Sequence, residues 1–418
     1  MKIARSIGRL RCAAVVVAML SLAGMTTACA TTTPSVTTTP SGVPSSLTVS
    51  SFNVNFTEMA QIKSLTKAGT GLVGVILPDE TSSTRYVDFD APYLAEAFKD
   101  AGYPSSDYKI ENALGVDATE LADAEAYVAE GAKVVIFDPI DSTVGAEVQS
   151  YLQSHGVAAI SYDRATFTGT DTYYVSFDNY LVGQLIGKGF EQCISSWNVA
   201  SPEVFELDGG EDTDPNAVSF AEGYNSIIWG NEKTPESLPL TNSLGYTLVG
   251  DEITPGWTNS LGETIFQQAF TAHPNINAVV VANDGLANVV IQDLKNDGVG
   301  PKKIPTTGQD ATLQGMEWQL EGYQCGSVYK PIYKEAQDAV ALATILRAGK
   351  TPPVALLNAT TSPPSGVTGV RQPASLLTPE WVTPSNMAST VIKDKFVSAS
   401  ALCTAVGTSV CTANGITP

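Results

Sequence analysis

Several residue types and motifs on which enzymes depend are scarce in this sequence of 418 residues or missing from it. Only two histidines occur, His155 and His273, and each lies near the C-terminal end of a predicted helix, where a histidine can interact with the last carbonyl groups. No GxSxG, Walker or GxGxxG motif stands at a strand–helix junction. A glycosidase needs a defined pair of carboxylates, and the sequence singles out no such pair. We therefore expect neither an enzymatic activity nor a cofactor.

Positive charge is also scarce. Lysine and arginine number 23 against 43 acidic residues, so the formal net charge is −20. This balance argues against nucleic-acid binding, because the phosphate backbone attracts positively charged surfaces. The segment Asp212-x-Asp214-x-Asn216 resembles the start of an EF-hand calcium loop, but Ala217 and Gly223 stand where that loop needs its glycine and its bidentate glutamate. We expect no metal site.

The one long apolar run, at residues 12–25, is too short to span a bilayer comfortably. Four basic residues and no acidic residue precede it, which is typical of a signal peptide, here assigned to residues 1–28. The sequence TTAC at 26–29 resembles a bacterial lipobox, although Thr26 stands where leucine is usual. The resemblance implies a lipid on Cys29 that anchors the exported chain to the outer face of the cell membrane. An ordinary secretory cleavage near the same place is the alternative.

The segment that follows is built for flexibility. Residues 30–48 are almost all threonine, serine, proline and glycine, and such a composition cannot bury a core. We assign lipid attachment and linker to residues 29–70. The roughly 350 residues beyond exceed one ordinary core, so we expect two lobes.

The pattern in this body is an alternation of short β-branched runs with amphipathic stretches. This alternation predicts an α/β fold with two doubly wound parallel-sheet lobes joined by a hinge. The predicted strands are 74–78, 109–113, 133–139 and 157–163 in the first lobe, and 203–209, 246–250, 277–284, 304–310 and 325–331 in the second. The predicted helices are 88–101, 118–130, 144–155, 216–229, 258–272 and 285–297. We place the N-terminal lobe at 71–195, the C-terminal lobe at 196–329, a return to the first lobe at 330–365 and a C-terminal extension at 366–418.

Four cysteines remain after the signal peptide and Cys29, and they allow three disulfide pairings, with free buried thiols as the alternative. Their spacing does not match a zinc site. Cys403 and Cys411 are eight residues apart, so a local bridge is easy to close. Cys193 ends a predicted helix and Cys325 begins a predicted strand, both at the end of the second lobe away from the cleft. We therefore predict the pairs Cys193–Cys325 and Cys403–Cys411.

Polar side chains follow many of the predicted strands, at the edge where open parallel sheets bind ligands. Aspartate and asparagine at such positions also cap helices, and capping explains many of them singly. It does not explain Arg85, Arg164 and Lys330, which are hydrogen-bond donors. Guanidinium, carboxylate and amide groups together suit a ring of vicinal hydroxyls, since each hydroxyl both donates and accepts. The aromatic faces of Tyr86 and Trp257 could pack on the C–H face of a sugar.

Specific segments carry a family resemblance. LPDETSSTRY (77–86), SYDR (161–164), SFDN (176–179), TGQDATLQG (307–315) and VYKPI (328–332) occur in the order of the periplasmic sugar-binding proteins of ABC importers, which have the type I periplasmic binding protein fold. Within that family the chain is most similar to the D-xylose-binding branch, which includes multi-sugar sensors. The resemblance departs at Tyr86, where that branch usually has tryptophan, in the acidic loop 209–217, and in the long segment 358–374.

The resemblance implies a ligand-binding set drawn from both lobes. Its members are Arg85, Tyr86, Asp163 and Arg164 from the first lobe, Asn216, Trp257, Asn283 and Asp310 from the second, and Lys330 at the crossing. It further implies a monomer that closes on D-xylose or a similar aldose and then docks on an ABC permease. A receptor that presents the bound sugar to a membrane signalling partner is the alternative. A transcription regulator shares the fold, but the export signal and the lack of a helix-turn-helix exclude it.

Overall fold

The computed structural model describes residues 42–169, 172–210, 213–233, 237–364 and 368–418. The predicted signal peptide, the predicted lipid site Cys29 and the acidic-loop residue Asp212 lie outside these described residues. Among the residues that are described, no helix is both long and apolar enough to cross a membrane.

The first lobe is built on a seven-stranded sheet with the order β11-β12-β5-β4-β3-β1-β2. Its pairs are parallel except β11 with β12. The central strands have the apolar sequences LVGVIL in β1 and, after the exposed Lys133, VVIF in β3, as expected of strands covered on both faces. The strands are β1 (Leu72–Leu77), β2 (Tyr108–Asn112), β3 (Ala132–Phe137), β4 (Ala158–Tyr162), β5 (Thr172–Phe177), β11 (Ala359–Thr360) and β12 (Pro373–Leu377).

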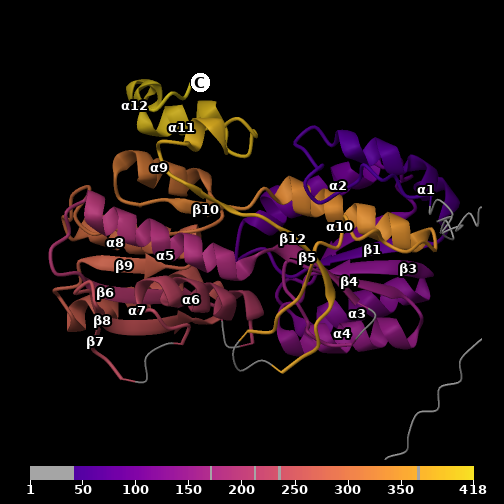
Figure 1. The fold of residues 1–418 in the computed structure, drawn as a ribbon, viewed down its shortest axis with the longest axis horizontal. Coiled ribbons are helices and arrows are strands. Elements are labelled where there is room, and N and C mark those ends of the chain that lie inside the picture. Colours follow the sequence, from indigo (N-terminus) through magenta and orange to yellow (C-terminus); the bar gives the residue numbers. More distant parts are fainter. Residues whose placement is uncertain (1–41, 170–171, 211–212, 234–236, 365–367) are drawn as a thin grey trace, which may run out of the picture. The chain divides into compact units, whose positions relative to one another are not determined.

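Helices cover both faces of this sheet. Successive side chains of a strand point to opposite faces, so each apolar strand presents apolar side chains to the helices on both sides. Val73 and Val75 of β1 pack with one helix group, and Leu72 and Ile76 pack with the other. The first group is η1 (Thr57–Ile62), α1 (Lys63–Ala68), the π-helical turn η2 (Tyr86–Asp90), α2 (Ala91–Asp100) and α10 (Ile332–Arg347). The second is α3 (Asp117–Ala129) and α4 (Ser142–Ser154), below the sheet in Figure 1.

The second lobe has a smaller sheet with the order β7-β8-β6-β9. The strands are β6 (Glu203–Gly209), β7 (Leu240–Thr241), β8 (Thr247–Thr254) and β9 (Ala278–Val281). Its helices are α5 (Asn179–Ser196), α6 (Pro215–Ile228), the short η3 (Pro255–Trp257), α7 (Asn259–Ala272), α8 (Asp284–Asn296) and α9 (Leu313–Glu321). The predicted strand at 304–310 is wrong as a continuous strand, because this segment makes only isolated parallel bridges, at Thr306 and Gln309.

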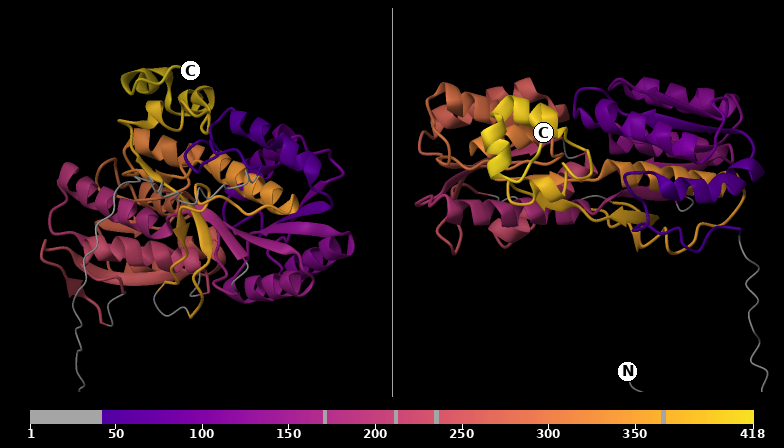
Figure 2. Two further views of the ribbon diagram at one scale, coloured as in Figure 1. Left: turned by 45° about the vertical axis from the view of Figure 1, so that its right-hand side comes forward. Right: turned by 90° about the horizontal axis from the view of Figure 1, so that it is seen from above.

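The remaining elements join the second lobe to the C-terminal extension. β10 (Ser327–Tyr329) pairs antiparallel with β13 (Glu380–Val382), and η4 (Met387–Ser389), α11 (Ala399–Val406) and α12 (Thr408–Ala413) follow. The two short helices stand apart from the sheets (Figures 1 and 2); α11 lies against α9, and α12 lies against α11. The doubly wound α/β architecture predicted from the sequence is confirmed.

Three domain boundaries differ from the prediction. The first lobe was predicted to extend to residue 195, but Val182, Ile186 and Phe190 of α5 pack in the core of the second lobe. The linker was predicted to reach residue 70, but Leu47, Phe52, Phe56 and Met59 are buried in the core beneath α2 and α10. The return segment was predicted to end at residue 365, yet β12 pairs in parallel with β5 and so belongs to the first lobe through Leu377. In the segment before β1 and in β12, local composition hid a short element that only long-range packing stabilises.

Two disulfides are present. Cys193 near the end of α5 is bonded to Cys325 just before β10, and Cys403 in α11 is bonded to Cys411 in α12. These are the pairs expected from the sequence, and the first closes a loop of 132 residues.

Candidate functional site

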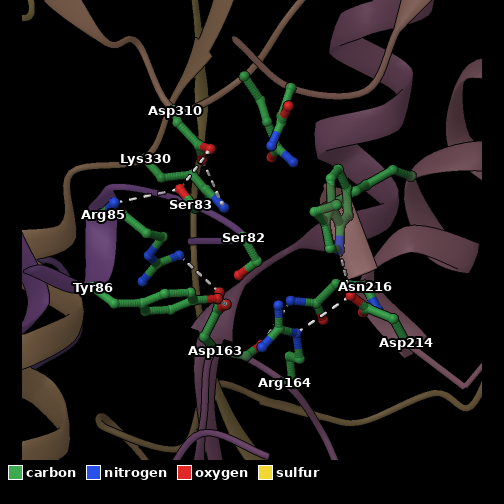
Figure 3. Close-up of a pocket in the computed structure, with 14 residues that line it drawn as sticks. Ser82, Ser83, Arg85, Tyr86, Asp163, Arg164, Asp214, Asn216, Asp310 and Lys330 are labelled. Atoms are coloured by element: carbon green, nitrogen blue, oxygen red, sulfur yellow. Dashed lines mark hydrogen bonds and ion pairs between the residues drawn. The ribbon is translucent and has the colours of Figure 1, made fainter. Parts of the chain in front are cut away.

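A cavity lies where loops from both lobes meet, at the carboxyl ends of the parallel strands (Figure 3). It encloses about 310 Å³ of space, solvent included. Only about 30 Å³ of this space is open to a sphere the size of a water molecule, so the facing side chains lie close to one another. Its lining is Ser82, Ser83, Arg85, Tyr86, Asp163, Arg164, Asp214, Asn216, Phe220, Trp257, Asn283, Gln309, Asp310 and Lys330.

Strand ends and helix starts position these side chains. Arg85 and Tyr86 lie where the loop after β1 enters the π-helical turn η2, and Asp163 and Arg164 directly follow β4. The residues of the second lobe follow strands in the same way. Asn283 caps α8, and its Oδ1 accepts a hydrogen bond from the Leu286 N–H at 2.9 Å.

Arg85 is buried among three carboxylates. Its guanidinium donates to Asp90 at 2.8 and 2.9 Å, to Asp163 at 2.8 Å and to Glu335 on α10 at 2.8 Å. Burial raises the pKa of Glu335 to about 8, although the charge of Arg85 opposes the rise. Four of the five N–H donors of Arg85 are used in these bonds, so its main effect is to fix the position of Asp163 at the cavity.

Asp163 is a preorganised acceptor. Its Oδ2 accepts from the Tyr86 hydroxyl at 3.1 Å while its Oδ1 faces Arg85. Burial alone would raise the pKa of Asp163, but the charges of Arg85, Lys330 and Arg164 hold that pKa below its ordinary value. The carboxylate is therefore ionised at neutral pH.

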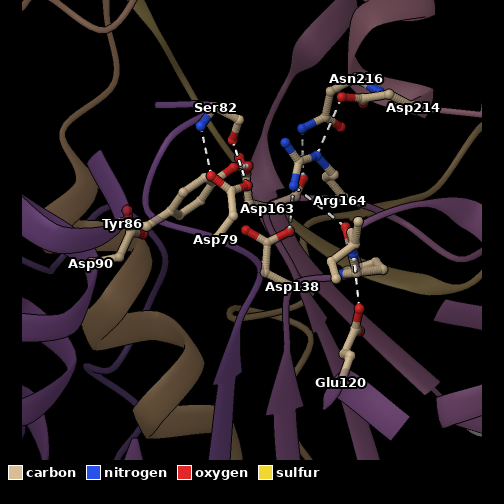
Figure 4. A network of polar contacts seen from close by, with 12 residues as sticks. Asp79, Ser82, Tyr86, Asp90, Glu120, Asp138, Asp163, Arg164, Asp214 and Asn216 are labelled. Atoms are coloured by element: carbon tan, nitrogen blue, oxygen red, sulfur yellow. Dashed lines mark hydrogen bonds and ion pairs between the residues drawn. The ribbon is translucent and has the colours of Figure 1, made fainter. Parts of the chain in front are cut away.

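Arg164 spans the two lobes with long contacts. Its Nε lies 3.3 Å from Asp214 Oδ2, and its Nη1 lies 3.4 Å from the Pro139 carbonyl and 3.6 Å from Asp138 (Figure 4). Burial raises the pKa of Asp138 well above its ordinary value. Since none of its contacts is short, the Arg164 guanidinium retains donor capacity for a ligand.

Trp257 is fixed as a wall of the cavity. Its indole N–H donates to Asp214 at 2.8 Å, and Asp214 also caps α6 through the N–H groups of Asn216 and Ala217. The ring lies against Gly209, where an added Cβ would come within 1.9 Å of the indole. The glycine is what allows the aromatic ring to sit this close to the end of β6.

Asp310 and Lys330 form the opposite side. Lys330 Nζ lies 3.4 Å from Asp310 Oδ1, and the Ser83 hydroxyl of the first lobe donates to Asp310 Oδ2 at 3.2 Å. Asp310 has a φ of 89°, a left-handed conformation that is strained for aspartate. Strain at such a position is typical of functional sites.

Asn216 connects the lobes at the centre. Its Nδ2 donates to the Asp163 carbonyl at 3.1 Å, and its Oδ1 accepts from Asn179 at 2.7 Å.

All nine predicted ligand-binding residues line this one cavity. Sequence reasoning did not include five further lining residues, Ser82, Ser83, Asp214, Phe220 and Gln309. The serines lie inside the motif at 77–86, Asp214 follows the predicted strand 203–209 and Gln309 lies near the end of the predicted strand 304–310, so the strand-end position was the available signal. Phe220 carried no such signal, because an apolar residue of an amphipathic helix is expected to lie in the hydrophobic core.

The cavity offers donors and acceptors on all sides and one aromatic wall. Among the described residues no group of three histidine, cysteine or acidic side chains could hold a metal ion. The arrangement can thus recognise a small polyhydroxylated molecule through paired donors and acceptors.

Comparison with known proteins gives the family. Residues 73–351 match the model of the periplasmic binding protein domain. The D-xylose-binding periplasmic protein of Escherichia coli is 32% identical over 288 residues, which is 69% of this chain and 80% of that protein. The chain belongs to the periplasmic sugar-binding protein family. A periplasmic sugar-binding protein is a binding protein and not an enzyme, in agreement with the sequence analysis.

Two further likenesses extend over most of this periplasmic sugar-binding protein. The multiple sugar-binding periplasmic receptor ChvE of Rhizobium radiobacter is 28% identical over 346 residues, 80% of this chain and 93% of its own. A carbohydrate transporter solute binding protein of Chloroflexus aurantiacus, solved in complex with D-glucose, superposes with a TM-score of 0.65 at 24% identity. It covers 79% of this chain and 98% of its own. At that identity the superposition shows the fold alone.

Proposed function

We propose that this protein is the substrate-binding component of an ABC-type sugar importer and binds D-xylose or a similar aldose between its lobes. The observation that carries the proposal is the convergence of Asp163, Arg164, Asp310 and Lys330 with Trp257 around one small cavity. Charged planar groups suit vicinal hydroxyls, and the indole suits the apolar face of a pyranose. The names of the D-xylose-binding relatives support the choice of sugar.

The proposed mechanism is closure of two lobes on one monosaccharide. A sugar that contacts both lobes binds the closed state more tightly and shifts the population toward it. The closed form then docks on the membrane permease, and no bond in the ligand changes.

Calorimetric titration with D-xylose, D-glucose and L-arabinose tests this function. We expect saturable binding of at least one aldose to the wild type. Asp310→Asn should weaken it by about 30-fold or more, because Lys330 loses its ionised partner in a desolvated site. Asp297→Asn, an exposed acid after α8, is the matched control and should bind as the wild type does. A wild type that binds no monosaccharide would overturn the proposal.

A sugar-sensing receptor is the second candidate, favoured by the match to the ChvE receptor over 80% of this chain. It uses the same pocket and differs only in the partner that reads the closed form. Deletion of the gene in its host distinguishes the importer from the receptor. Loss of an importer component abolishes sugar uptake, whereas loss of a receptor leaves uptake intact and abolishes a transcriptional response.

We also propose that Cys29 carries a lipid that anchors the protein to the outer face of the cell membrane. The basic start, the apolar run at 12–25 and the TTAC sequence support this anchor. Cys29→Ser should move the protein from the membrane fraction to the soluble fraction or leave the precursor uncleaved. A normally processed variant that stays in the membrane fraction would contradict it.

A further inference from the structure

The hairpin formed by β11 and β12 contacts the back of the loop that carries two pocket residues. The segment 358–374, which is longer than the family resemblance requires, contains β11 and the start of β12. β12 lies beside β5 (Figure 1), and Ala374 packs with Ala165, Phe167 and Tyr174 in a small buried cluster. The loop at 163–168 thus faces the cavity on one side and packs against the hairpin on the other.

That loop is held in a strained backbone conformation. Asp163 has a φ of 56° and Phe167 a φ of 52°, both in the left-handed region that non-glycine residues avoid. Such conformations persist only where surrounding contacts impose them. At Asp163 the contacts come from its own carbonyl, which accepts from the Tyr174 hydroxyl at 2.7 Å and from Asn216 at 3.1 Å.

At the other end of the loop the contacts come from the hairpin. Gln372 is completely buried, and its amide nitrogen faces three acceptors: the Thr168 carbonyl at 2.7 Å, the Thr172 hydroxyl at 2.8 Å and the Thr166 hydroxyl at 3.3 Å. Thr166 and Thr168 lie in the loop and Thr172 begins β5, so one side chain ties the loop to the strand that follows it.

The hairpin backbone adds a second tie. The Val370 N–H donates to the Phe167 carbonyl at 2.8 Å. Gly369 lies so close that an added Cβ would come within 2.4 Å of Phe167 Cβ. The hairpin is itself closed by Gln372, whose backbone N–H donates to Thr361 Oγ1 at 2.8 Å and whose carbonyl accepts from the Thr361 N–H at 2.9 Å.

We propose that Gln372 is a positioning residue for ligand binding, through which the β11–β12 hairpin holds the loop 163–168 so that Asp163 and Arg164 face the cavity. Gln372 itself does not line the cavity, so it acts only through the loop. The inference rests on the proposed sugar-binding function for its affinity readout, but the loop geometry can be measured without a ligand.

The test compares Gln372→Met with Gln337→Met. Gln337 is an equally buried glutamine of the same lobe, whose amide donates to the Asn53 carbonyl at 2.9 Å and the Tyr333 carbonyl at 2.7 Å, and none of these groups belongs to the loop 163–168. Both variants keep side-chain length, lose buried donors and should lose similar thermal stability. We expect Gln372→Met alone to bind the preferred aldose about tenfold more weakly, and to exchange the amide hydrogens of 163–168 faster in the absence of sugar.

Equal losses of affinity in the two variants, or unchanged exchange of the loop in Gln372→Met, would overturn the positioning role. If Gln372→Met does not fold, Thr172→Val removes one acceptor of Gln372 without changing shape and should give the same pattern more weakly. A wild type that binds no aldose would overturn the proposed function, and the exchange experiment would still decide the role of Gln372.

Discussion

The charged side chains of the cavity are paired before any ligand arrives. Arg85 is held by three carboxylates, and Lys330 faces Asp310 at 3.4 Å. Such pairing fixes the geometry that a sugar meets, and it reduces the ordering that binding must impose. It also means that Arg85→Ala would leave three buried acids without their counter-ion, so that variant reports on folding as much as on binding. Asp310→Asn is the cleaner probe for this reason.

Buried acids should make the stability of the protein pH-dependent, and Glu120 on α3 shows this most simply. Its Oε2 accepts from the Ile140 N–H at 3.0 Å, and burial raises its pKa from 4.5 to about 8. Between these values the folded protein keeps a proton that the unfolded chain releases, so stability falls as the pH rises. Glutamine does not ionise, and Glu120→Gln should therefore lose less stability than the wild type between pH 5 and pH 8.

Chemical denaturation of both proteins at pH 5 and pH 8 measures this difference. Glu125→Gln, an exposed position of the same helix, is the control and should follow the wild type. A Glu120→Gln variant whose stability falls with pH as steeply as the wild type would contradict the assignment of a proton to Glu120.

The sequence was informative about pocket residues because strand ends meet at one edge of a parallel sheet. Arg85, Arg164 and Lys330 stood out since donors do not cap helix N-termini. It could not reveal Phe220, nor that Asp214 holds both Arg164 and Trp257, because these contacts join segments far apart in the chain.

At the scale of elements, the segment before β1 is part of the fold. Leu47, Phe52, Met59, Ile62 and Leu65 are buried against α2 and α10. Burying each such side chain contributes roughly 1.5–3 kcal/mol, so their sum is comparable to the whole stability of a typical domain. A chain that begins at Ser45 should fold and unfold like the mature protein, whereas a chain that begins at Gly71 should not fold.

Circular dichroism and thermal denaturation of the two shortened chains decide this point. Cooperative unfolding of the chain that begins at Gly71 would show that the segment is dispensable. The predicted linker was too long. The segment poor in apolar residues ends near residue 48, and the prediction did not include the helices η1 and α1 that follow it.

The two disulfides should differ in their effect on stability. Constraint of the unfolded chain grows with loop size and is about 5 kcal/mol for the 132-residue separation of Cys193 and Cys325, against about 2.5 kcal/mol for the 8-residue separation of Cys403 and Cys411. Denaturation of the variants Cys193→Ser/Cys325→Ser and Cys403→Ser/Cys411→Ser measures the two effects. A larger loss for the second pair would indicate that packing of α11 on α9 depends on the local bridge.

Element prediction worked where local and long-range preferences agree. The apolar runs of β1, of β9 and of β3 after Lys133 were visible because strands buried on both faces have no polar alternation. The segment 304–310 has the sequence IPTTGQD and reaches its neighbours only at single bridges, and β12 was hidden at the end of a proline- and glycine-rich stretch. In both cases the pairing partner, and not the segment, decides the structure.

At the scale of the whole molecule, contacts join the two lobes across the cavity. The Ser83 hydroxyl meets Asp310, Arg164 meets Asp214, and Asn216 meets the Asp163 carbonyl. A sugar that adds contacts on both sides should stabilise the folded protein by about 2.7 kcal/mol at 100 times its dissociation constant. Thermal denaturation with and without the preferred aldose measures this, and Asp310→Asn should show a much smaller shift at the same sugar concentration.

The place of Trp257 gives the protein a built-in optical reporter. Its indole is hydrogen-bonded to Asp214 and forms a wall of the cavity, so a pyranose ring arriving there displaces water from the face of the chromophore. The fluorescence emission of Trp257, one of five tryptophans, should therefore shift in wavelength or change in intensity when a sugar binds. Trp257→Phe would silence that signal, which makes occupancy measurable in real time, without a label, on the native chain.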